Sequence, residues 1–256
     1  MQDPSPFRWI NRDGGAPVLI LCDHASNAIP SALGDLGLDQ AALEDHIAWD
    51  VGAARVAEGL AHHFEAPAIL SGYSRLVIDC NRYPDEANAI PAVSDGVAVP
   101  GNADLTPEDV AWRQDTVFWP YHREIEATLA QFSDAGRTPV VISVHSFTPV
   151  YAGERRPWDV AICWRDDDRM SAPVLEALGR EPALTVGDNE PYSLDPADDY
   201  SLIEYGLAQG LAHLLVEIRN DGLADGAGVA RWTERLAQAI EPAMSNPAVR
   251  QRRPRS

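Results

Sequence analysis

The stretch PVLILCDHASN, residues 17–27, joins an apolar run directly to a group of polar side chains. Its first half, PVLIL, predicts a short buried strand, because aliphatic residues follow one another there without a polar interruption. Asp23, His24, Ser26 and Asn27 come immediately after it. In open α/β sheets, ligands bind beyond the carboxyl ends of the strands. The stretch therefore predicts a central strand with a functional site at its end.

Similar apolar runs recur along the chain and alternate with amphipathic stretches. We expect strands at 17–22, 67–71, 75–79, 138–144, 158–163 and 213–218, and helices at 39–61, 107–133, 169–179 and 225–242. Such alternation is typical of a sheet covered by helices on both faces. The predicted fold class is therefore α/β, as a three-layer α/β/α domain with a mixed, largely parallel sheet. One domain over residues 1–256 is expected, with a frayed tail at 247–256.

The composition is that of an acidic chain that can bury a core. Of the 256 residues, 45% are hydrophobic, and the formal net charge is −19. This charge disfavours nucleic acid and anionic membranes as partners, since both call for a basic face. No apolar run is long enough to span a membrane. The first residues also lack the basic start and apolar stretch of a signal peptide. We therefore expect a cytoplasmic protein.

Two residue types narrow the chemistry further. All 20 basic residues are arginine, which excludes a Schiff-base lysine and the lysine of a Walker A loop. Cys22, Cys80 and Cys163 are odd in number and far apart. Such cysteines fit neither a disulfide framework nor a cysteine-based zinc knuckle.

Polar residues crowd the ends of four predicted strands. They are Asp23 and His24 after 17–22, Asp79, Asn81 and Arg82 after 75–79, His145 and Ser146 after 138–144, and Glu217, Arg219, Asn220 and Asp221 around the end of 213–218. One such group could be a turn whose polar atoms hydrogen-bond one another, but four groups on one edge of a sheet predict a functional site. Two histidines among nearby acids favour a metal, and a catalytic zinc takes three nitrogen or oxygen ligands beside an open position.

The third metal ligand has two candidates. On the predicted helix 39–61, Asp50 falls in the apolar stripe, where an unpaired charge is costly. A metal or an arginine would compensate it. Asn27 lies three residues after His24, but its amide oxygen is a poorer zinc ligand than a carboxylate. Asp50 is therefore favoured over Asn27.

The acid and the arginines at the strand ends have both functional and structural interpretations. Glu217 lies in the apolar run LLVEI, where burial raises its pKa towards that of a general base. It shares a strand face with Arg219, so a structural ion pair remains an equal alternative. Arg75 and Arg82 flank the strand at 75–79, and their guanidinium forks suit a carboxylate substrate. Pairing with Asp79 or Asp85 is the structural alternative.

Six segments in order resemble the N-formylglutamate amidohydrolase family. They are CDHASNAIP, AWDVGA, SRLVIDCNRYPDE, VHSF, GDNEPYS and GLAHLLVEIRND, and the resemblance runs from about residue 15 to 240. The resemblance implies a fold related to the zinc carboxypeptidases, aspartoacylase and succinylglutamate desuccinylase. Two positions depart from the pattern of these relatives. Asn27 stands where the HxxE zinc motif has its glutamate, and Tyr205 stands where many relatives have a histidine.

The resemblance also implies a reaction and roles for residues. The reaction is zinc-dependent hydrolysis of an N-acyl amide, most simply of N-formyl-L-glutamate, a small acidic substrate. His24 and His145 match zinc ligands, with Asp50 as the expected third, and Glu217 matches the catalytic glutamate. Asn81 and Arg82 match a DxNR motif that holds a substrate carboxylate. Arg75 or Arg219 would then hold a second carboxylate or the developing oxyanion.

Three other functions stay open at this point. Cys22 and Cys163 end predicted strands, so a metal-free Cys–His amidase is one alternative. A zinc peptidase or another N-acyl amino acid deacylase is the second. The third is a non-catalytic binding module on the same fold.

Overall fold

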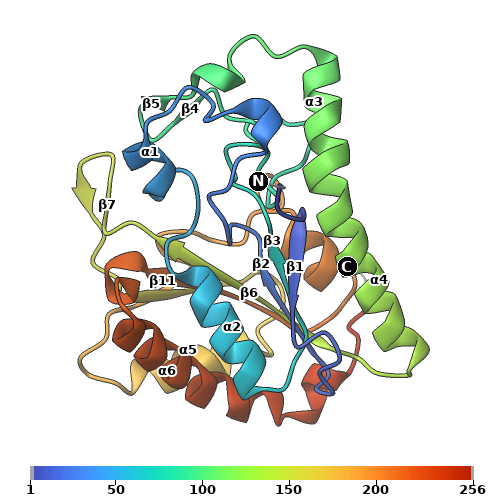
Figure 1. The fold of residues 1–256 in the computed structure, drawn as a ribbon. Coiled ribbons are helices and arrows are strands. Elements are labelled where there is room, and N and C mark those ends of the chain that lie inside the picture. Colours follow the sequence, from blue (N-terminus) through green and yellow to red (C-terminus); the bar gives the residue numbers. More distant parts are fainter. Residues whose placement is uncertain (1–2, 255–256) are drawn as a thin grey trace.

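A seven-stranded sheet runs through the middle of the computed structural model, which describes residues 3–254 (Figure 1). In spatial order the strands are β1 (Phe7–Ile10), β3 (Ala68–Ser71), β2 (Val18–Cys22), β6 (Val140–Phe147), β11 (His213–Arg219), β9 (Val160–Cys163) and β10 (Val186–Asp188). The four strands from β3 to β11 are parallel to one another. β1 runs antiparallel to β3 and β9 antiparallel to β11, while β10 is parallel to β9. The sheet is therefore mixed and mostly parallel.

Helices cover both faces of the sheet (Figure 1). On one face, α2 (Ala53–His63), α5 (Ser171–Gly179) and α6 (Gly226–Met244) pack on the even-numbered residues of β2, β6 and β11. On the other face, α4 (Trp119–Asp134) packs on odd-numbered strand residues such as Leu19, Leu21 and Val141. This alternation follows from the period of two in a strand, because both faces of a central parallel strand are buried. The predicted three-layer α/β/α fold is confirmed.

Shorter elements lie beyond the carboxyl ends of the parallel strands. They are α1 (Gln40–Glu44), the hairpin of β4 (Val93–Ser94) and β5 (Val97–Ala98), and the hairpin of β7 (Val150–Tyr151) and β8 (Glu154–Arg155). Residues in or next to these elements line a cavity that is described below. None of the helices among residues 3–254 is long and apolar enough to cross a membrane.

The expected strand at 75–79 is wrong. These residues form turns, because local polar groups satisfy the backbone there in place of a neighbouring strand. The Ser74 hydroxyl accepts a hydrogen bond from the Leu76 N–H, and the Ser74 carbonyl accepts one from the Val77 N–H. Arg75 then reaches forward four residues to bond Asp79. Serine side chains compete with regular structure in this way.

The expected helix at 39–61 is two helices, α1 and α2, separated by residues 45–52. Gly52 precedes α2 with a φ of +86°, a left-handed conformation that no right-handed helix contains. Asp50 therefore lies in the connecting loop and not on a helix face. The expected helix at 107–133 is α3 (Pro107–Arg113) and α4, joined by a π-helical turn at 114–118.

The segment at 247–254, part of the expected frayed tail, is partly ordered on the surface of the domain. Residues Pro247–Arg250 form a 3-10 helix with a buried Val249. The Arg253 N–H then bonds the Gly210 carbonyl at 2.8 Å. These contacts fix the segment on the body of the molecule. Residues 255–256, at the end of the expected tail, and residues 1–2, at the start of the chain, lie outside the described part.

Candidate active site

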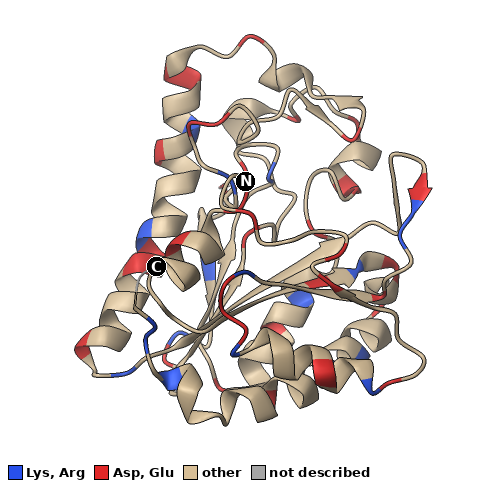
Figure 2. Cartoon of the chain, turned by 180° about the vertical axis from the view of Figure 1, so that it is seen from behind, with Lys and Arg blue, Asp and Glu red and all other residues tan. Residues whose placement is uncertain are grey.

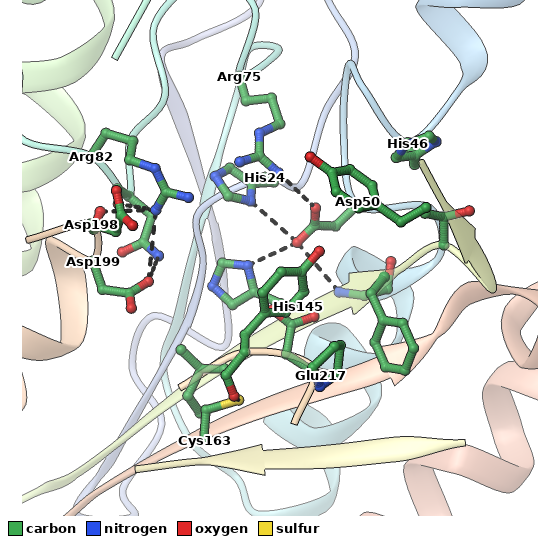
Figure 3. Close-up of a pocket in the computed structure, with 18 of the residues that line it drawn as sticks. His24, His46, Asp50, Arg75, Arg82, His145, Cys163, Asp198, Asp199 and Glu217 are labelled. Carbon is green, nitrogen blue, oxygen red and sulfur yellow. Dashed lines mark hydrogen bonds and ion pairs between the residues drawn. The ribbon is translucent and has the colours of Figure 1, made fainter. Parts of the chain in front are cut away.

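A cavity of about 440 Å³ lies at the carboxyl ends of β2, β6 and β11 (Figure 3). It brings together seven of the eight predicted site residues, which are His24, Asp50, Arg75, Asn81, Arg82, His145 and Glu217. They come from the end of β2, the turns at 75–82, the loop before α2, and strands β6 and β11. The eighth, Arg219, is not part of the lining.

His24, Asp50 and His145 form a buried cluster whose candidate ligand atoms all lie within 4.8 Å of one another. The Asp50 Oδ2 atom is 3.2 Å from His24 Nδ1 and 2.8 Å from His145 Nδ1. Two imidazole nitrogens and one carboxylate oxygen make a three-ligand set of the type found in catalytic metal sites. The three predicted ligands therefore form one candidate metal site.

Carboxylates behind the two histidines orient their rings. His24 Nε2 is 2.7 Å from Asp79 Oδ1, and His145 Nε2 is 3.2 Å from Asp23 Oδ2. When Nε2–H donates to these carboxylates, the Nδ1 lone pair of each ring is free for a metal. Asp23 is itself held by hydroxyl donors, Tyr121 at 2.9 Å and Ser201 at 2.6 Å. Both rings thus present the same nitrogen to the cluster.

Each charged group of the cluster lies next to groups of opposite charge. Burial opposes ionisation of Asp79, but Arg75 and His24 outweigh it and hold the pKa of this carboxyl well below its usual range. Burial also opposes protonation of His145, yet hydrogen bonds to Asp23 and Asp50 raise its pKa well above the usual value. The cluster of the metal-free chain therefore favours positive charge, and a metal ion competes with protons for it.

Glu217 lies next to the cluster through the register of the sheet. It is the direct partner of His145 where β11 pairs with β6, and both side chains point to the face covered by α4. Burial raises the pKa of Glu217 to about 7. Its Oε2 atom is buried without a hydrogen-bond partner in the described chain. A buried acid with this pKa is suited to proton transfer.

Arg219 does not pair with Glu217 in the part of the chain that the structure describes. Its guanidinium lies 2.9 Å from Asp159 and 2.9 Å from Asp221, and it also donates to the Trp158 carbonyl. The ion pair with Glu217 that the sequence left open is therefore not formed. Arg219 ties β11 to the start of β9 instead.

Arg75 and Arg82 both line the cavity, and both bond acidic segments of the chain. Arg75 donates two hydrogen bonds to Asp79 Oδ2, at 2.7 and 3.0 Å, and lies 3.6 Å from Asp50 Oδ1. Arg82 donates to the Asp198 carbonyl at 2.8 Å and lies 3.8 Å from the Asp199 carboxylate. Asn81 donates to that same carboxylate at 2.9 Å.

Asn27 and Tyr205 lie outside the cavity lining. The Asn27 side chain turns away to donate to the Leu43 carbonyl at 2.8 Å. Asp50 and not Asn27 thus lies beside the two histidines. The Tyr205 hydroxyl lies 3.1 Å from His122 Nδ1 in the core under α4. Tyr205 is therefore a buried core residue and not part of the cavity wall.

The three cysteines are free and buried. Burial raises the pKa of Cys22, Cys80 and Cys163 well above the usual value. Cys163 lines the cavity, but its thiol donates to the Tyr192 carbonyl. Because the thiolate is the nucleophile, these surroundings disfavour the Cys–His alternative.

Several cavity residues were not singled out from the sequence, notably Asp198, Asp199, Tyr151 and Tyr192. They come from the β7–β8 hairpin and from the loop at 187–200. The loop's length and its Pro, Gly and Asp content are signals of a functional loop. They indicate the segment but not which side chain faces the site.

The fold and the cluster together define an α/β protein with a candidate metal site at the carboxyl ends of its parallel strands, where such proteins bind ligands. The family model of N-formylglutamate amidohydrolase matches residues 16–224, and the chain belongs to this family of amidohydrolases. The resemblance of the six segments is thereby confirmed.

Two solved structures show how far the likeness extends. A gene product from Agrobacterium tumefaciens matches with a TM-score of 0.91 and 35% identity, over 94% of this chain and 95% of that one. N-formylglutamate amidohydrolase from Ralstonia eutropha JMP134 matches with a TM-score of 0.66 and 19% identity, over 94% of this chain and 97% of that one. The second likeness shows a shared fold. No curated protein sequence matches this chain.

Proposed function

We propose that this chain hydrolyses the amide bond of an N-acyl amino acid, with N-formyl-L-glutamate as substrate and formate and L-glutamate as products. The observation that carries the proposal is the juxtaposition of a buried His24–Asp50–His145 cluster with Glu217 in one cavity. Family membership supports amide hydrolysis as the reaction class. The Ralstonia eutropha relative, named for N-formylglutamate, suggests the substrate.

Zinc is the metal that the donor set favours. Two neutral imidazole nitrogens and one carboxylate would hold a zinc ion and leave a position for another ligand, as in catalytic zinc sites. The fit rests on His24 and His145, whose Nε2 atoms are engaged by carboxylates so that their Nδ1 atoms face Asp50. A bound zinc ion would polarise the amide carbonyl and lower the pKa of a water molecule.

Glu217 is the proposed general base and acid. Its raised pKa allows it to take a proton from the attacking water and to give that proton to the departing amine. Its position on β11, level with His145 on β6, holds the carboxylate on the same face of the sheet as the metal ligands. The absence of a protein partner for Oε2 in the described chain leaves that oxygen free to accept.

The polar wall of the cavity would bind and orient the substrate. Asn81 and Arg82 offer N–H donors to a carboxylate. Arg75, fixed between Asp79 and Asp50, places a permanent positive charge beside the cluster, where an oxyanion would develop. Arg219 lies outside the cavity lining, and we leave it out of the proposed site.

The test is turnover by protein of defined metal content. We expect formate release from N-formyl-L-glutamate by the zinc-loaded protein, loss of turnover after chelation, and recovery when zinc is restored. Treatment with a thiol alkylator should leave turnover intact, since the three cysteines are buried. Turnover that survives metal removal, or that alkylation abolishes, would contradict the proposal in favour of a Cys–His amidase.

A further inference from the structure

The cavity offers a substrate few free positive charges. Its wall carries six acidic residues, which are Asp50, Asp95, Asp195, Asp198, Asp199 and Glu217, but only two arginines. Asp79 and Asp50 hold Arg75, and Arg82 lies beside Asp199. Among the described residues that line the cavity, each arginine therefore already has a carboxylate next to it.

Asn81 and Arg82 contact the Asp199 carboxylate in the way that a binding site contacts an acidic ligand. Asn81 donates its Nδ2–H to Asp199 Oδ1 at 2.9 Å. The same oxygen lies 3.8 Å from a nitrogen of Arg82, which Figure 3 shows beside Asp199. An amide and a guanidinium that converge on one carboxylate oxygen make a charge-assisted binding site. The Asn81–Arg82 pair thus binds a carboxylate in this structure, and that carboxylate belongs to the chain itself.

We infer that Asp199 occupies the place on Asn81 and Arg82 that a substrate carboxylate would take, and that this residue sets the preference of the site between a carboxylate and a neutral group. The inference rests on the proposed amide hydrolysis. The pair adjoins the metal cluster, because the Asn81 N–H bonds the same Asp79 oxygen that His24 contacts. The carboxylate nearest the scissile amide, the α-carboxylate, is therefore the one that competes with Asp199.

Displacement of the Asp199 carboxylate breaks its hydrogen bonds from the Asn81 amide and from the Asp195 N–H, each at 2.9 Å, but leaves the chain that follows Asp199 in place. The N–H groups of Tyr200 and Ser201 both donate to Asn81 Oδ1, at 3.1 and 2.9 Å, and these bonds hold the chain that follows Asp199. Burial raises the pKa of Asp199, and neither Arg82 nor Asn81 reverses that effect. Its ionised form is therefore held where its charge is disfavoured, and exposure to water relieves that cost.

The experiment compares Asp199→Asn with Asp198→Asn. Both substitutions remove one charge from the same loop, but the Asp198 carboxylate bonds Asn88 and contacts neither Asn81 nor Arg82 by its side chain. The substrates are N-formyl-L-glutamate and its α-carboxamide. In Asp199→Asn we expect the ratio of kcat/KM for the acid to that for the amide to rise about ten- to hundredfold, through KM, as for a hydrogen bond to a charged group. In Asp198→Asn the ratio should stay at the wild-type value.

A binding measurement separates this inference from the proposed function. Calorimetry on the zinc-loaded protein gives the affinities for L-glutamate and for its α-carboxamide, L-isoglutamine, without turnover. If the wild-type protein hydrolyses neither substrate, the proposed function fails, while the ratio of these affinities still reports on Asp199. Asp199→Ala serves as a second variant if Asp199→Asn does not fold. A ratio that is unchanged in the Asp199 variants, or that rises equally in Asp198→Asn, overturns the inference.

Discussion

Asn27 lies only three residues after His24 in the sequence, but Asp50, from the loop before α2, is the residue that lies beside both histidines. Its Oδ2 atom is near the Nδ1 atoms of both rings, whereas the Asn27 amide bonds the Leu43 carbonyl. We expect Asp50→Ala to lose most of its zinc, because two histidines alone make an incomplete ligand set. Asn27→Ala should retain about one equivalent, as measured by mass spectrometry of the purified proteins. The reverse pattern would return Asn27 to the ligand set.

Glu217 makes a catalytic prediction. Glu217→Gln keeps the shape of the side chain but cannot accept a proton, so kcat should fall by about 10²–10⁴. Metal content should remain that of the wild type, because Glu217 is not one of the three clustered ligands. A variant that loses zinc along with activity would show that Glu217 supports the metal and does not transfer the proton.

The same residue makes a prediction about stability in the metal-free protein. The folded-state pKa of Glu217 is raised to about 7 from the ordinary value of 4.5. The folded state therefore binds the proton more tightly than the unfolded state does. The stability that proton binding at Glu217 adds to the folded state is fully present below the unfolded pKa, falls as the pH rises, and is lost above about 7.

Glu217→Gln abolishes this pH dependence. At pH 8 the metal-free variant should therefore melt at a higher temperature than the wild type, and at pH 4 the difference should disappear. A Glu217–Arg219 ion pair would predict the opposite, since loss of one partner of a buried pair destabilises a protein by about 3–5 kcal/mol. Thermal melts of both proteins at the two pH values distinguish the outcomes.

At the scale of elements, the loop before α2 is the part of the fold on which the metal site depends most. Gly52, two residues after Asp50, has a φ of +86°, and a Cβ there would lie 2.5 Å from the Leu223 side chain. Gly52→Ala thus combines backbone strain with overpacking and should cost about 2–4 kcal/mol of unfolding free energy. Its zinc affinity should fall as well, because the loop carries Asp50.

Gly96 provides the matched control for this substitution. It also has a left-handed φ, of +78°, but nothing lies within 4 Å of the position that a Cβ would take. Gly96→Ala should therefore cost only about 1 kcal/mol, with zinc affinity unchanged. Equal costs for the two variants in denaturant titrations would show that the contact with Leu223 relaxes freely.

The sequence predicts the sheet well where hydrophobicity alone determines a strand. Four parallel strands and the antiparallel β9 were placed within three residues of their observed ends. The predicted strand at 75–79 is wrong because the apolar residues Leu76, Val77 and Ile78 are buried in turns. A short apolar run without a periodic pattern does not distinguish a buried strand from a buried turn. The bonds that make those turns, from Ser74 and Arg75, depend on tertiary position.

The site was predictable to the extent that its residues end strands. His24 follows β2, and His145 and Glu217 lie in β6 and β11, so parallel topology brings them together. Asp50 was predicted as a ligand from its place in the apolar stripe of an expected helix, but it reaches the site from a loop. Its buried position, inferred from that stripe, was nevertheless correct. The position of Asp199 in the cavity could not be predicted from the sequence, because local periodicity does not determine the path of a long loop.

At the scale of the whole molecule, acidic residues outnumber basic ones. Figure 2 shows the acidic positions spread over helices and loops. The net charge of −19 should slow the approach of a dianionic substrate. Raising the ionic strength from about 0.01 M to about 0.15 M shortens the screening length from about 30 to about 8 Å. We therefore expect kcat/KM for N-formyl-L-glutamate to increase severalfold across this range.

An uncharged N-formyl amino acid amide is the control, since salt should leave its kcat/KM unchanged. The measurement is the initial rate at low substrate concentration in buffers of equal pH. A decrease with salt for the acidic substrate would show that the positive charge of the metal centre and arginines outweighs the acidic surface at the distance where encounter is decided.

The pairing of Glu217 with His145 across β11 and β6 has a consequence for how this protein can diversify. Their spacing is set by the backbone ladder in the middle of a buried sheet, while the walls of the cavity come from hairpins and loops. Insertions and replacements in those walls can admit different molecules while leaving the reacting groups in place. A single residue inserted within β11, by contrast, would turn the acid to the opposite face, among the helices α2 and α6. Small changes in the hairpins and loops of the cavity wall can therefore alter substrate selectivity without moving Glu217 or His145.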